Sequence, residues 1–275
     1  MILYVSDLDG TLLNKNAKLT DYSQKTINQL METGMNFTVA TARTYATVSK
    51  ILNGLNVNAP IILMNGALIR DLQKDEYVYS AIIDNSVSKN IITIIHEMKL
   101  YGFMYTIQNG DMVPYYEEIA TPEMRAFYEE RKNRYYKQFL QTSDFGLVND
   151  NSLYFSFINK KENLMPFYDK IKDFQDIKLT FYRDVYSDDL WYLEIFSPNA
   201  SKENAVNFLK SQYGYDKIIC FGDNLNDISL FNASNRKYAV ENAAVELKQL
   251  ADEIVGSNDS DGVAKFLKDN YGKDF

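Results

Sequence analysis

The stretch Ile2-Leu3-Tyr4-Val5-Ser6-Asp7-Leu8-Asp9-Gly10-Thr11 joins a short apolar run to two carboxylates and a glycine. The apolar run is long enough for a buried strand, and open α/β sheets place their ligand sites just beyond such strands. Carboxylates there cost desolvation free energy unless a cation or hydrogen-bond donors compensate. Mg²⁺ suits this position, because it binds a few carboxylates together with water and phosphate oxygens. The competing interpretation is an acidic surface turn, since Asp-Gly is common in turns.

The sequence on both sides of this stretch alternates between strand and helix patterns. Thr20 and Ser201 are the expected N-caps of two of the helices, which Gly34 and Gly214 end. The strand patterns cover 36–40, 60–64, 217–221 and 237–240, and further helices are expected around Val48–Leu55, Ile228–Phe231, Val245–Leu250 and 262–270. Strands separated by helices of this length predict an α/β fold with a doubly wound parallel sheet.

The middle of the chain reads differently. Helix patterns over 86–100, 122–137 and 162–174 lie between strand patterns at 103–107 and 153–157, and the region is rich in tyrosine. Its length is that of a small α+β domain. We therefore predict a core made of 1–82 and 189–275, interrupted by an inserted domain over 83–188.

Composition narrows the function classes. The chain has 275 residues and a formal net charge of −8, which argues against broad nucleic-acid binding. One cysteine (Cys220) and one histidine (His96) exclude an intramolecular disulfide, a cysteine-built zinc site and a multi-histidine metal site. No apolar run is long enough to span a bilayer, and the N-terminus does not read as a signal peptide. The expectation is a cytoplasmic protein, a monomer or weak homodimer, with no membrane or nucleic-acid partner.

A second group of polar residues closes the strand at 217–221. It reads Gly222-Asp223-Asn224-Leu225-Asn226-Asp227. If this strand neighbours the first one, Asp223, Asn226 and Asp227 can share a hard cation with Asp7. Alone, the segment is equally readable as a helix-capping turn, with Asp223 or Asn224 as the N-cap.

Two further residues stand where an anion would bind. Thr41 follows the strand at 36–40 and can offer a hydroxyl, although it is equally credible as the N-cap of the next helix. Lys202 lies in the first turn of the helix capped by Ser201, where a cation opposes the helix dipole. An anion at that terminus explains the lysine, whereas a solvated surface lysine is the commoner case.

Together these residues resemble the four ordered motifs of the haloacid dehalogenase-like superfamily. The motifs are Asp7-x-Asp9-Gly10-Thr11, Thr41, Lys202 and Gly222-Asp223-x-x-Asn226-Asp227. Their order, and the large insertion between the second and third, are similar to the Cof-type phosphatases with a type IIB α/β cap. The resemblance covers essentially the whole chain. Ala42 and Asn199 depart from it, because the family usually has glycine at those two positions.

The resemblance implies a Mg²⁺-dependent phosphatase acting on small phosphomonoesters, with the insertion as a lid. Asp7 is then the nucleophile, Asp9 the general acid and base, and Thr41 and Lys202 the groups that hold the phosphoryl oxygens. The implied Mg²⁺ ligands are Asp7, the backbone carbonyl of Asp9 and Asp223, with Asn226 or Asp227 behind them. Arg43 and Asn65 stand at strand ends and are expected to bind substrate, with Gly10 and Ala42 beside them.

Other interpretations stay open. A phosphotransferase or phosphomutase would use the same residues, with a sugar hydroxyl in place of water. A phosphoester-binding regulator without catalysis is a different class, and the four intact motifs argue against it. A nucleotide-binding Rossmann protein is weaker still, because no glycine-rich phosphate-binding motif occurs. In the insertion, Tyr105, Tyr115, Tyr154 and Tyr182 either shape a substrate pocket or, for most of them, pack in the core.

Overall fold

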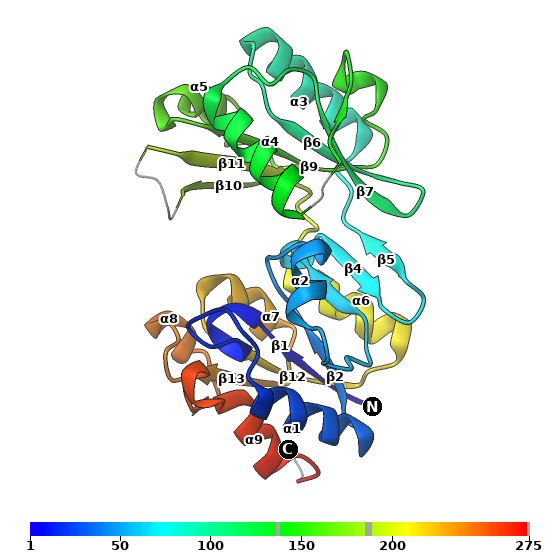
Figure 1. Cartoon of the computed structure of the whole chain (residues 1–275), viewed down its shortest axis with the longest axis vertical. Helices are drawn as coiled ribbons and strands as arrows, with labels where there is room; N and C mark the ends of the chain where they lie inside the picture. Colours follow the sequence, from blue (N-terminus) through cyan, green and yellow to red (C-terminus); the bar gives the residue numbers. More distant parts are fainter. Residues whose placement is uncertain (136–137, 185–188, 274–275) are drawn as a thin grey trace. The chain divides into compact units, whose positions relative to one another are not determined.

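A computed structural model describes residues 1–135, 138–184 and 189–273 of the chain (Figure 1). The chain forms two compact units. The core unit comprises Met1–Tyr79 and Ala200–Phe275, and the inserted unit comprises Ser80–Asn199. Among the described residues, no helix has the length and apolar character needed to cross a membrane.

The core unit is built on a parallel sheet of five strands. Its order is β14-β13-β12-β1-β2, with bounds Glu253–Val255, Arg236–Val240, Lys217–Gly222, Ile2–Ser6 and Asn36–Val39. β1 is central, between β12 and β2, and Ser6 is in register with both Phe221 and Val39. The carboxyl ends of these three strands therefore meet at one edge, as the α/β prediction requires.

The helices of the core unit begin where local capping signals place them. α1 (Asp21–Glu32) begins after Thr20, whose side chain accepts a hydrogen bond from the Ser23 amide. α6 (Lys202–Tyr213) begins after Ser201 and ends at the left-handed Gly214. α9 (Gly262–Asn270) packs against α1, and α6 packs against α7 (Ile228–Asn232) (Figure 1). The remaining helices are α2 (Tyr45–Ile51) and α8 (Val245–Lys248).

The third expected strand does not extend the parallel sheet. β3 (Ile61–Leu63) meets the edge of this sheet through a parallel bridge between Ile62 and Ala40, and pairs antiparallel with β4 (Leu68–Asp71). β5 (Glu76–Ser80) completes a separate three-stranded sheet. The turn after β3 reverses the chain through left-handed Met64 and Asn65, which explains the hairpin. β4, β5 and β14 were not expected from the sequence.

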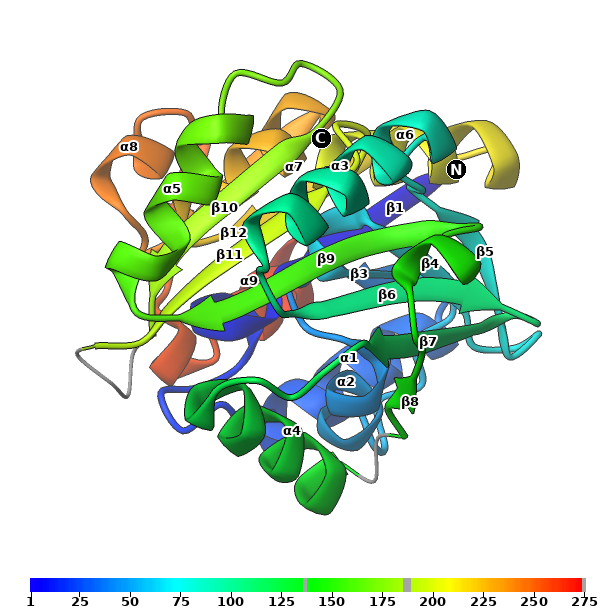
Figure 2. The ribbon, with the colours of Figure 1, turned by 90° about the horizontal axis from the view of Figure 1, so that it is seen from above.

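The inserted unit contains a second, mostly antiparallel sheet. Its order is β10-β11-β9-β6-β7-β8, with bounds Lys178–Arg183, Trp191–Phe196, Ser152–Asn159, Phe103–Gln108, Asp111–Tyr116 and Leu140–Gln141. α3 (Asn85–Met98) and α5 (Lys161–Ile171) lie on the same side of this sheet (Figure 2). They supply Ile91, Ile95, Leu164 and Phe167 to a core that they share with alternate strand residues such as Phe155 and Leu193. α4 (Pro122–Tyr135) carries Phe127 against Phe103.

The boundaries of the inserted unit differ from the expected 83–188. β11 pairs with both β9 and β10 and so belongs to the inserted unit's sheet, and residues 189–199 lie in the inserted unit rather than in the core. Residues 80–82 also lie in the inserted unit. Sequence pattern alone cannot assign a strand to one sheet or the other, because both sheets need apolar strands. Lys137, the expected end of α4, and residues 185–188 lie outside the described residues.

The tyrosines of the inserted unit are mostly packed. Tyr105 and Tyr154 are buried and stack with ring centroids 4.1 Å apart, and Tyr115 is also buried. Tyr182 is 44% exposed. Three of the four tyrosines singled out in the sequence therefore have the core role expected for most of them.

Candidate active site

Asp7 stands directly after β1, at the edge where the three central strands end. Its backbone N–H donates to the Phe221 carbonyl at 3.0 Å, which fixes the residue between β1 and β12. Its side chain accepts a hydrogen bond at Oδ1 from Lys202 Nζ at 2.6 Å. Lys202 is fully buried and is not the solvated surface lysine of the competing interpretation. The first and third motifs thus meet although 195 residues separate them.

A second carboxylate shares the lysine. Lys202 Nζ donates to Asp227 Oδ1 at 2.6 Å, while Asp227 Oδ2 accepts the backbone N–H groups of Asp223 at 3.0 Å and Asn224 at 3.2 Å. Asp227 therefore ties the lysine to the loop that follows β12. Asn224 caps the short turn Leu225–Asp227, so the capping interpretation of this segment is confirmed.

Burial and charge shift the acidity of this site. Burial raises the pKa of Asp7 to about 8, although Lys202 opposes the shift. Burial also raises the pKa of Asp223 to about 6, against the hydrogen bond from Thr11. For Lys202, burial favours the neutral amine, but the carboxylates of Asp7 and Asp227 outweigh it and raise the pKa above its usual value. Lys202 is therefore a fixed cation. Its single positive charge does not balance the carboxylates around it.

The residues present fit a divalent cation. Asp7, Asp223 and Asp227, here called the core acidic cluster, each offer an oxygen, and these oxygens lie within 4.8 Å of one another. Carboxylate oxygens are the ligands that Mg²⁺ prefers. Asp227 already uses both of its oxygens on Lys202 and on backbone amides, so Asp7 and Asp223 are the freer ligands of the three. Asn226, also expected near the metal, donates its side-chain amide to Asn65 Oδ1 at 3.2 Å.

Asp9 lies at the mouth of the site, paired with Arg43. The guanidinium donates from Nε to Oδ2 at 2.7 Å and from Nη2 to Oδ1 at 2.6 Å. The sequence predicted substrate contact for Arg43 and gave no sign of this two-pronged ion pair. Both side chains are partly exposed, at 27% for Arg43 and 47% for Asp9, so the pair is open to solvent.

Thr41 is buried at the end of β2. Its hydroxyl oxygen accepts the Arg43 N–H at 3.2 Å, which leaves the hydroxyl proton for another acceptor. It is not the N-cap of the next helix, because α2 begins after Thr44. Ala42, the neighbour of Thr41, is exposed. Thr41 and Arg43 thus lie on the same short loop, from which Arg43 reaches Asp9.

Two glycines allow backbone segments to approach closely. A Cβ at Gly10 would lie 2.3 Å from Asp223 Oδ2, and a Cβ at Gly66 would lie 2.0 Å from the Ser201 carbonyl. Both have positive φ, +77° and +93°. Gly66 therefore packs against the first turn of α6, the turn that carries Lys202. The sequence placed Asn65 at a strand end, but gave no sign of this contact.

A second group with metal-ligand chemistry lies in the inserted unit. His96, Glu117 and Asp144, here called the surface cluster, also have ligand atoms within 4.8 Å of one another. His96 Nε2 is 2.8 Å from Glu117 Oε1, which also accepts the Phe145 N–H at 2.6 Å. His96 and Asp144 are exposed or nearly so. None of the four sequence motifs contributes to this cluster.

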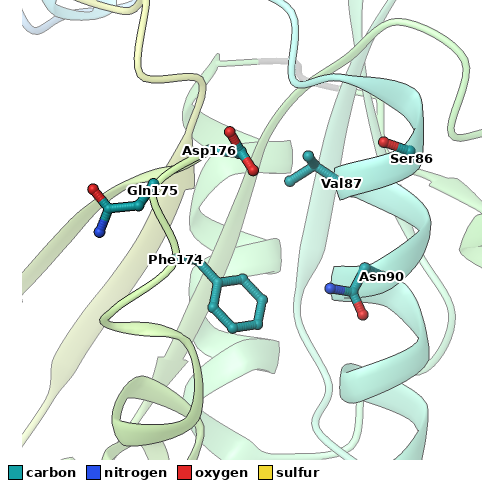
Figure 3. A pocket seen from close by; sticks show the side chains of 6 residues that line it. All are labelled: Ser86, Val87, Asn90, Phe174, Gln175 and Asp176. Atoms are coloured by element: carbon teal, nitrogen blue, oxygen red, sulfur yellow. The ribbon is translucent and has the colours of Figure 1, made fainter.

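A hollow of about 420 Å³ also lies in the inserted unit (Figure 3). It separates the first turns of α3 from the segment after α5, and its lining consists of Ser86, Val87, Asn90, Phe174, Gln175 and Asp176. The lining has one carboxylate and no cation to attract a phosphate. We therefore place the chemistry at the core acidic cluster.

Comparison with known proteins identifies the family of the chain. The family model for haloacid dehalogenase-like hydrolases matches residues 4–267. Phosphatase YwpJ of Bacillus subtilis is 25% identical over 98% of this chain and 99% of its own. From the same organism, 5-amino-6-(5-phospho-D-ribitylamino)uracil phosphatase YwtE is 27% identical over 95% of each chain.

Solved structures share the fold. TM0651 from Thermotoga maritima has a TM-score of 0.78 at 23% identity, over 99% of this chain and 98% of that one. The subclass IIB sugar phosphatase BT4131 has a TM-score of 0.69 at 18% identity, over 98% of both chains. The family match extends over nearly the whole chain, and the resemblance drawn from the four motifs is confirmed: the chain belongs to the haloacid dehalogenase-like hydrolases.

Proposed function

We propose that this protein is a Mg²⁺-dependent phosphatase that hydrolyses small phosphomonoesters through an aspartyl-phosphate. The observation that carries the proposal is the position of Asp7. Its carboxylate stands at the carboxyl end of the central strand, bonded to the buried Lys202 at 2.6 Å and within 4.8 Å of two further carboxylates. Nucleophile, cation and metal-ligand chemistry therefore meet at one point.

In the first step, Asp7 attacks phosphorus. Lys202 donates to Oδ1 and orients the carboxylate, which leaves Oδ2 as the attacking atom. A bond forms between Oδ2 and phosphorus, the ester P–O bond breaks, and Asp9 gives its proton to the leaving alkoxide. Thr41 offers its hydroxyl proton to a phosphoryl oxygen. The charge on these oxygens is what Lys202 stabilises.

In the second step, water hydrolyses the aspartyl-phosphate. Asp9, now ionised, takes a proton from the attacking water, and the bond between Asp7 and phosphorus breaks to release phosphate. The pairing with Arg43 sets a condition on this cycle. Both Asp9 oxygens accept hydrogen bonds from the guanidinium, so one of these bonds weakens when Asp9 takes up a proton.

Electrostatics explains the need for added positive charge. A dianionic phosphate about 4 Å from the Asp7 carboxylate is repelled by roughly 8 kcal/mol at an effective dielectric constant near 20. Asp7 and Asp223, with the Asp9 backbone carbonyl, would hold Mg²⁺, and Asn226 and Asp227 would support them. A bound Mg²⁺ would offset much of the repulsion between the phosphate and the nucleophile. Lys202 supplies the fixed part of that charge.

The test is phosphate release from a panel of small phosphomonoesters, with Mg²⁺ and with EDTA. The panel includes sugar phosphates and phosphorylated polyols, because relatives are named for such substrates. We expect release that requires Mg²⁺ and falls at least about 1,000-fold in Asp7→Asn. Release that survives Asp7→Asn in a preparation free of other phosphatases would overturn the nucleophile assignment. Transfer to an added sugar exceeding hydrolysis would favour a phosphotransferase instead.

We further propose that the inserted unit sets the choice of substrate, as a lid does in capped enzymes. Cytoplasmic location and a monomeric or weakly dimeric state remain predictions from composition. Light scattering over a range of protein concentrations tests the second of these.

A further inference from the structure

Two asparagines outside the four motifs hold the backbone of the loop that follows β1. Asn242, between β13 and α8, donates from Nδ2 to the Gly10 carbonyl at 2.7 Å. Its Oδ1 accepts the backbone N–H of Asn258 at 3.0 Å. Asn258 in turn donates from Nδ2 to the Leu13 carbonyl at 2.8 Å. The two side chains form a relay from the end of the chain to the loop.

The loop needs such support. Asp9 and Gly10 depart from helical geometry within the turn Leu8–Leu12, and Gly10 has a left-handed φ of +77°. The start of the loop is fixed by the bond from Asp7 N–H to Phe221. Its middle and end are fixed by Asn242 and Asn258. Without them, the segment that carries Asp9 loses two of its backbone attachments.

The same turn also reaches the second loop of the site. Two residues after Asn242, the Ala244 N–H donates to the Asp223 carbonyl at 2.7 Å. Asp223 meets the first loop as well, because Thr11 Oγ1 donates to Asp223 Oδ1 at 2.9 Å. The turn 242–244 therefore contacts both loops that carry the acidic residues. It can fix the distance between Asp9 and Asp223.

We propose that Asn242, supported by Asn258, is a positioning residue for catalysis, which sets the loop of Asp7 and Asp9 against Asp223. This inference rests on the proposed function. Neither asparagine needs to touch substrate for the effect, because the bonds go to backbone carbonyls. Outer groups that orient reacting residues typically contribute about 10- to 100-fold to activity.

The chain contains a matched control. Asn58 makes the same kind of bridge, donating from Nδ2 to the Met35 carbonyl at 2.8 Å and accepting the Phe37 N–H at 2.9 Å. Its partners flank the first residue of β2, at the amino end of the strand, away from the edge that carries the site. Asn58 and Asn242 are both exposed. Asn58→Ala and Asn242→Ala therefore remove equivalent bonds without adding charge.

The experiment compares the two variants in the full chain. We expect Asn242→Ala to lower kcat about 10- to 100-fold with KM within about threefold, and Asn58→Ala to leave kcat within about twofold. Asn258→Asp, which removes the donor to Leu13, should lower kcat by less than Asn242→Ala does. Equal kcat in the Asn242→Ala and Asn58→Ala variants would overturn the proposal.

A second readout does not depend on activity. Hydrogen–deuterium exchange of the amides of residues 8–13, in metal-free protein, should be faster in Asn242→Ala than in Asn58→Ala, because the loop opens locally. Unchanged exchange would also overturn the proposal. If Asp7→Asn stays active, the proposed function fails, yet the exchange measurement still decides whether Asn242 holds the loop.

Discussion

The molecule contains two clusters with metal-ligand chemistry, and they differ in how the fold treats them. The core acidic cluster stands at the carboxyl ends of parallel strands, and a lysine is buried among its carboxylates. The surface cluster lies in the inserted unit, where His96 is 40% exposed and Glu117 also accepts a backbone N–H. The ligand atoms lie within 4.8 Å of one another in both clusters. Both clusters therefore bring ligand atoms close together. Only the core acidic cluster is also buried beside a fixed cation, and this distinguishes it as the catalytic candidate.

The strongest test of this difference is to remove the buried lysine. In Lys202→Met, Asp7 and Asp227 lose their cation while buried, so we expect loss of activity and a decrease of about 3–5 kcal/mol in the free energy of unfolding. The matched variant is Lys170→Met, which removes an exposed pair with Glu97 at 3.0 Å and should cost less than about 1 kcal/mol. Urea denaturation measures both. Equal decreases in the free energy of unfolding of the two variants would mean that burial does not make the Lys202 ion pairs differ from the exposed pair.

Glycine substitution tests whether the site needs the close approach of backbone segments. Gly66→Ala places a methyl group 2.0 Å from the Ser201 carbonyl at a φ of +93°, and we expect it to cost at least about 3 kcal/mol and to displace Lys202. Gly110 in the inserted unit also has a positive φ, +84°, but nothing lies within 4 Å of its Cβ position. Gly110→Ala should therefore cost only about 1 kcal/mol. Thermal unfolding distinguishes them, and similar costs would contradict the packing role of Gly66.

One carboxylate from each cluster can be neutralised without a change of shape. Asp223→Asn removes a proposed metal ligand, and we expect phosphate release to fall at least about 100-fold at a fixed Mg²⁺ concentration. Asp144→Asn keeps an acceptor for the Gly146 N–H and should leave activity within about twofold. The assay is the phosphate panel described above. A comparable loss in both variants would assign function to the surface cluster.

A pH dependence of stability is also expected. The raised pKa values of Asp7 (about 8) and Asp223 (about 6) mean that the folded state binds more protons than the unfolded state between the unfolded and folded values. Stability of the metal-free protein therefore falls as pH rises from about 4 to 8, with a contribution from the partly exposed Asp223 on the order of 1 kcal/mol after screening.

Mg²⁺ would bind the ionised carboxylates of the proposed site, so its stabilising effect should grow over the same pH range. Urea denaturation in EDTA and in Mg²⁺, at several pH values, measures both trends. Asp223→Asn should flatten the metal-free profile. Stability that rises with pH in EDTA would show that burial does not destabilise the ionised form of these carboxyl groups.

Sequence by itself determined most of the local structure of the core unit. Thr20 and Ser201 were identified as N-caps, Gly214 as a helix end and residues 262–270 as a helix, because caps, end glycines and apolar spacing act over a few residues. The four motifs were also readable, since each follows a strand or opens a helix. Their convergence followed from the rule that ligand sites gather at the carboxyl ends of parallel strands.

Only the tertiary structure decided which of these groups touch. Arg43 pairs with Asp9, Asp227 divides its oxygens between Lys202 and two amides, and Asn242 reaches Gly10 across 232 residues. The assignment of β11 to the inserted sheet was equally invisible in the sequence. Such contacts join segments far apart in the chain, and their side-chain types are common at the surface. Sequence pattern specifies what each element is, whereas the packing of elements specifies which polar groups satisfy one another.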